Sequence, residues 1–538
     1  MFVLAALAVL AGCSSTNKAT PPPTGGFSDS NLKGTYVFSF SGTDVTVTPT
    51  TFFTVVGSFA ADGNGNITAG TVDIVDPAYG VLQGESIATG SRYTVGKDGR
   101  GSGVLNTAAA STAFSSIGID FVLASSSHGL ITLFDGNGTG SGTIDLEDGT
   151  VTQSSLGSYV FGLTGVDSVG DPFATAGALG LNGTTTIQAG GLQDINDNGN
   201  PSTALTLTGS VTIGASGAPG TAQLTTNSAY NTLQFDVWTI DATHLKLIET
   251  DGFALLSGDA LSQQTSIAAG QLVYTMAGFD ASSSSVLAVG GFLAYNGTSA
   301  INGGGASYED INDGGGLGNS ITVAGALQST GGGRYQLTLS NFFNNSVGAG
   351  TYLFAAYPST TGILLMEIDN GGVTAGTAFP QTATTFASTQ GYGLNLTGQN
   401  GGNGSGAVEV DDIAEFIANS GGTLSNGFID ENDGGSLGGF QSGLNLGSGG
   451  TYTFDASGSG RGELDYPVTG TLIGTLNLDF YVANNGTVLF IDADSSLQTG
   501  VGSFQLQNSA DPAIAVAHTA NHFSMLRAVA ARRAQRKK

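Results

Sequence analysis

The side chains best suited to ion binding in this sequence are aspartates that recur in pairs, three residues apart. They occur as DIVD at 73–76, DIND at 194–197, DIND at 310–313 and DEND at 430–433. Hard cations such as Ca²⁺ accept carboxylate, amide and carbonyl oxygens together. The candidate calcium ligands are therefore Asp73, Asp76, Asp194, Asn196, Asp197, Asp310, Asn312, Asp313, Asp430, Asn432 and Asp433.

The segment that starts at Asp194 matches the first half of an EF-hand loop and then departs from it. Oxygen-bearing side chains alternate and Gly199 is the sixth residue, but the twelfth is Leu205 instead of a glutamate. An EF-hand needs that bidentate glutamate, so this motif is excluded. Two interpretations remain: a looser oxygen cage around a cation, and turns in which Asp and Asn bond their own backbone. The turn interpretation is favoured, because Asp, Asn and Gly are the usual turn residues.

A second set of acids ends a late apolar strand in four segments: ITLFD at 131–135, LKLIE at 245–249, ILLME at 363–367 and VLFID at 488–492. Strand alternation directs each of these carboxylates toward the apolar face. Another oxygen-bearing residue follows two positions later, as in Asn137. The candidate ligand-binding acids are Asp135, Glu249, Asp251, Glu367, Asp369, Asp492 and Asp494.

A core-facing carboxylate is costly unless it is paired, hydrated or at the end of a sheet. One interpretation is that each unit presents an acid at a barrel mouth, where it would bind a cation or a sugar hydroxyl. The favoured alternative is a charge at the strand end that prevents pairing with other sheet edges.

The histidines, short motifs and paired carboxylates of the sequence do not indicate an active site. The four histidines are His128, His244, His518 and His522; the last two would share a helix face, with no third metal ligand in view. No HExxH or GxxxxGK[ST] motif occurs. Paired carboxylates cleave glycosides only at a set separation, which the sequence does not define. We therefore expect no enzymatic activity.

The acids recur because the chain repeats. Four segments open alike: GTYVFSFSG at 34–42, GSYVFGLTG at 157–165, QLVYTMAG at 271–278 and QGYGLNLTG at 390–398. Their tyrosines, Tyr36, Tyr159, Tyr274 and Tyr392, are spaced by 123, 115 and 118 residues. The first and fourth units also share a Gly-Arg-Gly turn, at 99–101 and 460–462. This predicts four β-repeats at 34–153, 154–268, 269–386 and 387–506.

The periodicity within each unit is two, which is typical of strands. Tyr36, Phe38 and Phe40 share one face of the opening strand. Asn-Gly, Asp-Gly and Gly-Gly pairs supply the turns of hairpins. The pattern predicts an all-β protein of four tandem antiparallel β-domains of about 118 residues, each with about eight strands. Because sequential hairpins dominate, an up-and-down barrel is favoured over a β-sandwich, and the units weakly resemble calycin-like barrels.

The N-terminus begins with an apolar run of the length found in signal peptides. Residues 1–12 are apolar. The last three of them and the residue that follows read Leu10-Ala11-Gly12-Cys13, which resembles the lipobox of bacterial lipoproteins. The resemblance implies a signal peptide at 1–12, cleavage before Cys13, and acylation that anchors this residue in the lipid bilayer. Residues 13–33 are then a tether rich in Ser, Thr and Pro. Ser14 directly after the cysteine is similar to the type sorted to the outer membrane.

The net charge of the chain excludes one class of binding partner. With 41 acidic and 14 basic residues the net charge is −27, so nucleic acid, whose phosphates would be repelled, is excluded as a partner. Six of the basic residues lie in 507–538, an Ala-rich tail that is predicted to be helical or disordered. A single cysteine excludes a disulfide framework.

Together these features predict a non-enzymatic bacterial cell-envelope lipoprotein. It would present four tandem β-domains for surface adhesion, matrix contact or multivalent binding of an extracellular or periplasmic ligand, with a glycan among the candidates. One alternative is a carrier of small apolar ligands inside calycin-like barrels, which requires an internal cavity. Another is a carbohydrate-active enzyme, which requires one divergent copy with an acid-lined cleft.

Overall fold

The computed structural model describes residues 26–111, 113–280, 285–344, 348–401, 407–446, 449–468, 475–494 and 498–509. Cys13, the signal peptide and most of the basic tail, with His518 and His522, lie outside these residues. The described chain consists of strands and two single 3-10 turns, η1 (Asp29–Asn31) and η2 (Gln153–Ser155). None of its elements is a helix long and apolar enough to cross a membrane.

The first sheet is a nine-stranded meander in which the first and last strands pair, in the order β4-β3-β2-β1-β9-β8-β7-β6-β5. Isolated bridges between Asn66 and Arg92 and between Ile87 and Thr107 join its two outer edges. Its strands are β1 (Lys33–Asp44), β2 (Thr51–Asp62), β3 (Ile67–Asp76), β4 (Gly80–Ser86), β5 (Arg92–Val95), β6 (Arg100–Asn106), β7 (Ser116–Leu123), β8 (His128–Leu133) and β9 (Gly138–Leu146).

The second sheet repeats this order, β13-β12-β11-β10-β18-β17-β16-β15-β14. Its strands are β10 (Ser158–Asp167), β11 (Pro172–Gly180), β12 (Leu192–Asp197), β13 (Asn200–Thr206), β14 (Thr208–Thr212), β15 (Gly220–Thr225), β16 (Thr232–Asp241), β17 (His244–Glu249) and β18 (Ala254–Ser262). An isolated bridge joins Thr186 and Ser210.

The third sheet closes into an eight-stranded barrel through the pair β19–β20, with β22 and β23 attached outside the circuit. Its strands are β19 (Gly270–Asp280), β20 (Ser285–Tyr295), β21 (Ala300–Asn302), β22 (Tyr308–Asp313), β23 (Gly316–Thr322), β24 (Ala324–Gly331), β25 (Arg334–Asn344), β26 (Gly348–Pro358), β27 (Ile363–Glu367) and β28 (Gly372–Pro380).

The fourth sheet closes in the same way through β30–β31, with β32 outside the circuit. Its strands are β29 (Gln390–Asn400), β30 (Val408–Asn419), β31 (Thr423–Asp433), β32 (Gly439–Leu446), β33 (Thr451–Phe454), β34 (Arg461–Pro467), β35 (Thr475–Asn484), β36 (Thr487–Asp492) and β37 (Thr499–Leu506). The predicted all-β class with four antiparallel barrel domains is thus confirmed. The strands number nine or ten per domain instead of about eight, because short strands such as β23 and β32 lie beside the closed circuit.

Aromatic side chains fill the barrels. In β1 the alternation places Tyr36, Phe38 and Phe40 in the buried cluster of the first barrel, and each of the other barrels has its own cluster. Two of the opening tyrosines also bond the turn before a late strand: the Tyr36 hydroxyl donates to the Ser126 carbonyl at 2.6 Å, and the Tyr159 hydroxyl donates to the Ala242 carbonyl at 2.6 Å. In the third barrel the Tyr274 hydroxyl instead donates to Glu309 at 3.1 Å.

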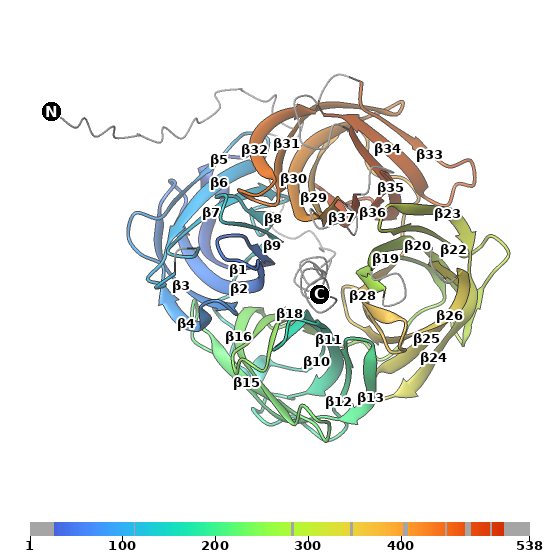
Figure 1. Cartoon of the computed structure of the whole chain (residues 1–538), viewed down its shortest axis with the longest axis horizontal. Coiled ribbons are helices and arrows are strands. Elements are labelled where there is room, and N and C mark those ends of the chain that lie inside the picture. Colours follow the sequence, from blue (N-terminus) through green and yellow to red (C-terminus); the bar gives the residue numbers. More distant parts are fainter. Residues whose placement is uncertain are drawn as a thin grey trace.

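The four barrels form a closed ring (Figure 1), in which the first and last strands of each barrel lie toward the middle. Neighbours meet through matching strands: β2 with β16–β18, β11 with β26–β28, β20 with β35–β37, and β30 with β7–β9. Three of these junctions are rich in buried apolar side chains. The junction of the fourth barrel with the first has a smaller apolar cluster of Val122, Leu130 and Ile413. Every barrel therefore has two neighbours.

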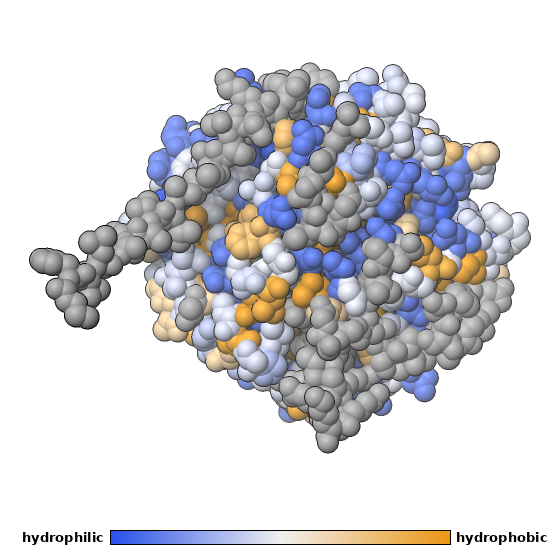
Figure 2. Space-filling model, turned by 45° about the horizontal axis from the view of Figure 1, so that its top comes forward, coloured by the Kyte–Doolittle hydropathy of each residue, from blue (hydrophilic) through white to orange (hydrophobic). Residues whose placement is uncertain are grey.

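The ring has two distinct ends. At the terminal end the described chain begins and finishes, and the Asn31 amide donates to the Ser509 carbonyl at 3.1 Å. The opposite end, here called the turn end, carries the hairpin turns that follow the acidic pairs and the late acidic strands. The large apolar residues that are exposed in the described chain all lie in or next to turns of this end: Val169, Phe253, Leu317, Leu437 and Phe440. On the face drawn in Figure 2 the visible hydrophobic residues form small separate groups among hydrophilic ones.

Candidate functional site

The first aspartate of each acidic pair is buried between two barrels. Asp73, Asp194 and Asp310 are fully buried and Asp430 is 4% exposed. Each lies at a β-bulge, and one carboxylate oxygen accepts a backbone N–H from the bulged strand. The donors are Gly84, Ala204, Ser320 and Gly443, all with positive φ, at 2.5–2.7 Å. The first aspartate therefore stabilises its own bulge.

The remaining acceptor capacity of Asp194 is used by the next barrel. Arg334 donates from Nε at 2.6 Å and from Nη2 at 3.0 Å, and the Tyr357 hydroxyl donates to the same carboxylate. Charge-assisted bonds of this bidentate kind are the strong ones. The carboxylate of the second barrel thus holds β25 and β26 of the third.

Asp310 repeats this arrangement between the third and fourth barrels. Arg461 donates from Nε at 2.7 Å and from Nη2 at 3.1 Å, and the Tyr481 hydroxyl donates at 2.7 Å. Asp479 also pairs with Arg461 at 2.9 Å. Burial raises the pKa of Asp479 to about 7.

The other two junctions each have one of the two kinds of donor: an arginine between the fourth and first barrels, and an aromatic N–H between the first and second. Arg100 of the first barrel donates to Asp430 of the fourth at 3.2 Å. The cross-strand partner of Arg100 is Val122, so a valine stands where Tyr481 stands opposite Arg461. At the first junction the indole of Trp238 donates to Asp73 at 3.0 Å. Burial raises the pKa of Asp73 to about 7. The same acidic position therefore contacts the neighbouring barrel at all four junctions.

The asparagine of each motif forms a second contact with the neighbour. Its Nδ2 donates to two backbone carbonyls that flank a late hairpin turn. The pairs are Asn196 with Glu367 and Gly372, Asn312 with Asp492 and Gln498, and Asn432 with Leu133 and Gly138, all at 2.7–2.9 Å. In the first unit Val75 stands at this position, within the apolar cluster of the junction. We call the aspartate and asparagine contacts together the interdomain clasp.

The second aspartates bind within their own barrel. Asp76 accepts the Ala78 N–H at 2.7 Å and the Thr51 hydroxyl at 3.1 Å, and burial raises its pKa to about 7. Hydroxyls or amides donate to the others: Tyr230 to Asp197, Ser285 to Asp313, and Asn400 to Asp433. The described residues contain no group of three or more His, Cys, Asp or Glu side chains placed to hold a metal ion. Calcium binding at these positions stays a prediction.

The strand-end acids lie at the turn end, each beside the oxygen-bearing residue that follows it. Asp135 accepts the N–H groups of Gly118 at 3.0 Å and Asn137 at 2.9 Å. Asp492 accepts the Asp494 N–H at 2.7 Å, and burial raises the pKa of Asp492 to about 8.

In the second and third barrels the acid is a glutamate. Glu249 accepts the Phe253 N–H at 3.2 Å, and burial raises its pKa to about 9. Asp251 accepts the same N–H at 2.9 Å. Burial also raises the pKa of Glu367 well above its usual range. Asp369, two positions later, accepts the Gly371 N–H at 2.7 Å.

The sequence patterns did not predict the arginine and aromatic side chains that bond the clasp aspartates. The shared Gly-Arg-Gly turn was one signal that could have pointed to the arginines. Its first glycine has a positive φ, +85° at Gly99 and +91° at Gly460. A Cβ on its last glycine would lie 2.3 Å from a phenylalanine ring of the next strand, at both Gly101 and Gly462. The motif therefore presents an arginine from a tight turn, but it does not say which acid that arginine meets.

A buried charge network joins the first and second barrels. His128 Nδ1 lies 2.6 Å from Asp145, and His244 Nε2 lies 2.7 Å from Asp259. Lys246 lies between the two carboxylates, at 3.6 Å and 3.1 Å. Burial alone would lower the pKa of Lys246, but Asp259 and Asp145 raise it, so the lysine stays charged. The two histidines that the sequence left unexplained are thus part of an interdomain ion network.

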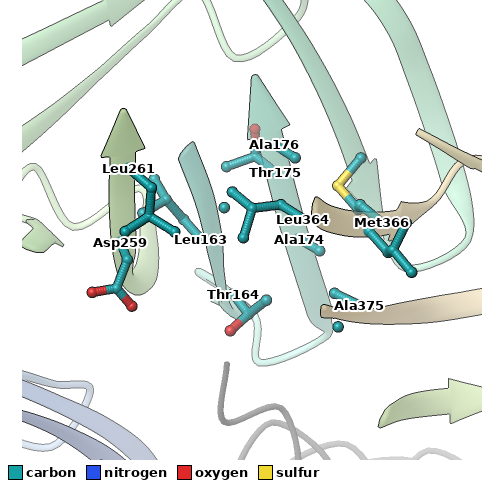
Figure 3. A pocket seen from close by; sticks show the side chains of 13 residues that line it. Leu163, Thr164, Ala174, Thr175, Ala176, Asp259, Leu261, Leu364, Met366 and Ala375 are labelled. Carbon is teal, nitrogen blue, oxygen red and sulfur yellow. The ribbon is translucent and has the colours of Figure 1, made fainter. Parts of the chain in front are cut away.

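A narrow cleft lies between the second and third barrels (Figure 3). Ala174, Ala176, Leu261, Leu364 and Met366 form much of its wall, and Asp259 lies at one side. The lining is thus mostly apolar, with one acid at its edge.

Comparisons with known proteins leave the family open. No family model and no curated protein matches the sequence. Among solved structures, transferrin binding protein B of Haemophilus parasuis Hp5 is 10% identical, over 72% of this chain and 82% of that one, with a TM-score of 0.16. The same protein of serogroup B Neisseria meningitidis is 11% identical, over 70% and 84%, with a TM-score of 0.16. CghA is 9% identical, over 92% and 95%, with a TM-score of 0.15. Likenesses this distant carry no argument about function.

Proposed function

We propose that this chain is a non-enzymatic, lipid-anchored binding protein of the bacterial cell envelope, attached to the outer membrane through acylated Cys13. The observation that carries the proposal is the polarity of the ring. Both ends of the described chain are at the terminal end, while the exposed apolar turns and the strand-end acids are at the other. A tether that leaves from the terminal end directs the turn end away from the membrane, toward extracellular or periplasmic ligands.

The anchor is tested by replacing Cys13 with Ser in the full chain. We expect the wild type to partition with membranes and to be released by detergent, and we expect the variant to be soluble. A variant that still requires detergent for release would contradict the anchor.

The orientation is tested by introducing one cysteine at Val169 in the turn end or at Lys33 in the terminal end, both of which are exposed. Acylated Cys13 has no free thiol. We expect a membrane-impermeant maleimide to label position 169 faster than position 33 on membrane-bound protein, with equal rates after detergent extraction. Faster labelling at position 33 would reverse the orientation.

Transport of a small apolar ligand is the second candidate. The barrel interiors are occupied by buried side chains, so this function depends on the cleft of Figure 3 instead. Leu364→Trp would fill the cleft, and it should abolish the binding of an apolar fluorescent probe. Unchanged probe binding would exclude this cleft as the site.

A further inference from the structure

The ring closes at a junction between barrels that are not consecutive in the chain. The first three junctions join each barrel to the one that follows it, whereas the fourth joins the last barrel to the first through β30 and β7–β9. Its apolar cluster of Val122, Leu130 and Ile413 is smaller than those of the other junctions. The ring can therefore open here without separating two barrels that the chain links directly.

The last described residues of the chain cross this junction at the terminal end. After β37 of the fourth barrel, the Gln507 amide donates to the carbonyls of Asp98 at 2.7 Å and Leu123 at 3.1 Å in the first barrel. The Asn508 N–H donates to the Ala124 carbonyl at 2.7 Å. These contacts join neutral groups, so their strength does not change with pH.

Four buried carboxyls gather around one guanidinium at the same junction. Asp98 of the first barrel and Asp430 of the fourth each pair with Arg100 at 3.2 Å. The charge of this arginine also acts on Asp120 of β7 and Glu415 of β30. The four acids are between 1% and 7% exposed, and no other described lysine or arginine forms an ion pair with any of them. If all four were ionised, three negative charges would exceed the charge of the arginine.

The two clasps that have both an arginine and a tyrosine are closer to balance. Asp194 pairs with Arg334, and two buried acids, Asp310 and Asp479, share Arg461. The junction that closes the ring thus holds more buried acid per cation than either of these clasps.

We propose that the ring opens between its fourth and first barrels when these carboxyls ionise, so that this junction is a proton-controlled gate. Protonated carboxyls are neutral and can stay buried, whereas carboxylates repel one another and lose their hydration inside the contact. Opening returns them to water. This inference goes beyond the proposed function, because it concerns the ring itself and not its membrane attachment.

Other titratable groups on the packed strands act in the same direction or are balanced locally. Strand alternation places Glu409 and Asp411 on the same face of β30 as Glu415, so their ionisation adds to the repulsion. Tyr466 lies close enough to Glu415 for its pKa to be raised by that acid as well as by burial. His128 of β8 is paired with an acid of its own barrel, Asp145 of β9.

The direction of the pH dependence follows from the acids of the cluster. Burial raises the pKa of Asp120 and of Glu415 well above its usual range, and the charges of Asp430 and Asp98 add to the shift. Their contribution to closure is fully present below the ordinary carboxyl pKa of about 4, and it is lost as pH rises through the raised values. The equilibrium constant for closure should fall by up to about tenfold per pH unit for each carboxyl that releases its proton on opening.

The test is small-angle X-ray scattering of the full chain with Cys13→Ser at pH 5, 7 and 9, with circular dichroism of the same samples. We expect the radius of gyration to increase with pH while the β-sheet signal stays constant, because one junction opens and the barrels remain folded. A constant radius would overturn the proposal. An increase that accompanies loss of the β-sheet signal would also overturn it, since the barrels themselves would then be unfolding.

A disulfide across the junction provides a lock. A Cβ placed on Gly393 of β29 lies 3.5 Å from the Cβ of Val122, which is within the range of disulfides. The oxidised double variant Val122→Cys, Gly393→Cys should keep the same radius from pH 5 to 9, and reduction should restore the expansion. Expansion of the oxidised protein would show that another part of the chain moves, and it would overturn the proposal.

Two neutral replacements identify the groups that drive the opening. Glu415→Gln and Asp120→Asn keep the shape of the side chain but cannot ionise, so each should reduce the expansion at pH 9. The matched control is Glu463→Gln, at an exposed position of β34, which should expand like the wild type. Expansion of both replacements to the extent of the control would exclude these carboxyls as the cause.

Discussion

The interdomain clasp predicts that Asp194→Asn destabilises the ring strongly. The amide keeps one acceptor oxygen for the Ala204 N–H, but it turns an NH₂ group toward the Arg334 guanidinium and the Tyr357 hydroxyl. Arg334 then loses its charged partner and keeps neutral acceptors: the retained amide oxygen, which its Nη2 reaches at 3.0 Å, and the Thr330 hydroxyl at 3.2 Å. Removing one partner of a buried ion pair costs about 3–5 kcal/mol. We expect a loss of this size in the free energy of unfolding.

Asp310→Asn is the matched variant and should cost less. Arg461 would still pair with Asp479 at 2.9 Å and with Asp455 at 3.3 Å. With its charge still compensated, the loss is closer to that of ordinary charged hydrogen bonds, about 1.5–3 kcal/mol. The two variants therefore separate the cost of an unpaired buried arginine from the cost of lost hydrogen bonds.

The assay is equilibrium urea unfolding, followed by circular dichroism and by the fluorescence of the one tryptophan, Trp238 in the second barrel. Asp465→Asn, at an exposed position of β34, is the control and should change the free energy of unfolding by less than about 0.5 kcal/mol. Restoring stability with the double change Asp194→Asn and Arg334→Met would support a buried-charge cost. Equal losses for Asp194→Asn and Asp310→Asn, or no loss for either, would refute the reasoning.

Three further predictions follow from the same contacts. Asn312→Ala removes two bonds to carbonyls of the fourth barrel and should lower the free energy of unfolding by about 2 kcal/mol in urea titrations; no loss would show that water replaces the amide. Burial raises the pKa of Asp492 to about 8. The stability that its protonated carboxyl contributes is therefore fully present below about pH 4 and is lost as the pH rises to 8, at about 1.4 kcal/mol per pH unit. Asp492→Asn should therefore reduce the pH dependence of stability, followed as the urea midpoint from pH 4 to 8. An unchanged pH dependence would contradict this prediction. Saturating chelator should leave the melting temperature unchanged if the acidic pairs are held by protein donors; a drop would favour calcium.

Local patterns in the sequence predicted most of the fold. Alternating residues such as Tyr36, Phe38 and Phe40 define one buried face whatever lies across the barrel, and the four copies repeat this pattern. Strand order followed from short hairpins, because sequential antiparallel strands pair with their neighbours. The sequence also placed the strand-end acids at a barrel end, since strand alternation and strand termination are local properties.

The partners of the acids could not be predicted in this way. Asp194 meets Arg334, 140 residues away, and Arg100 meets Asp430, 330 residues away. Within each unit the acid and the arginine look like parts of one site, yet each acid binds the arginine or aromatic residue of the next barrel. The repeat period contains no information about this offset, because it depends on how whole barrels pack.

By itself, then, the sequence determined four similar sheets, their buried faces and the ends of their strands, since each of these depends on neighbours along the chain. The closure of the ring and the pairing of each clasp were decided by tertiary structure alone. Their physical reason is the same: burial between barrels changes the cost of a charge, and burial exists only once the barrels have met.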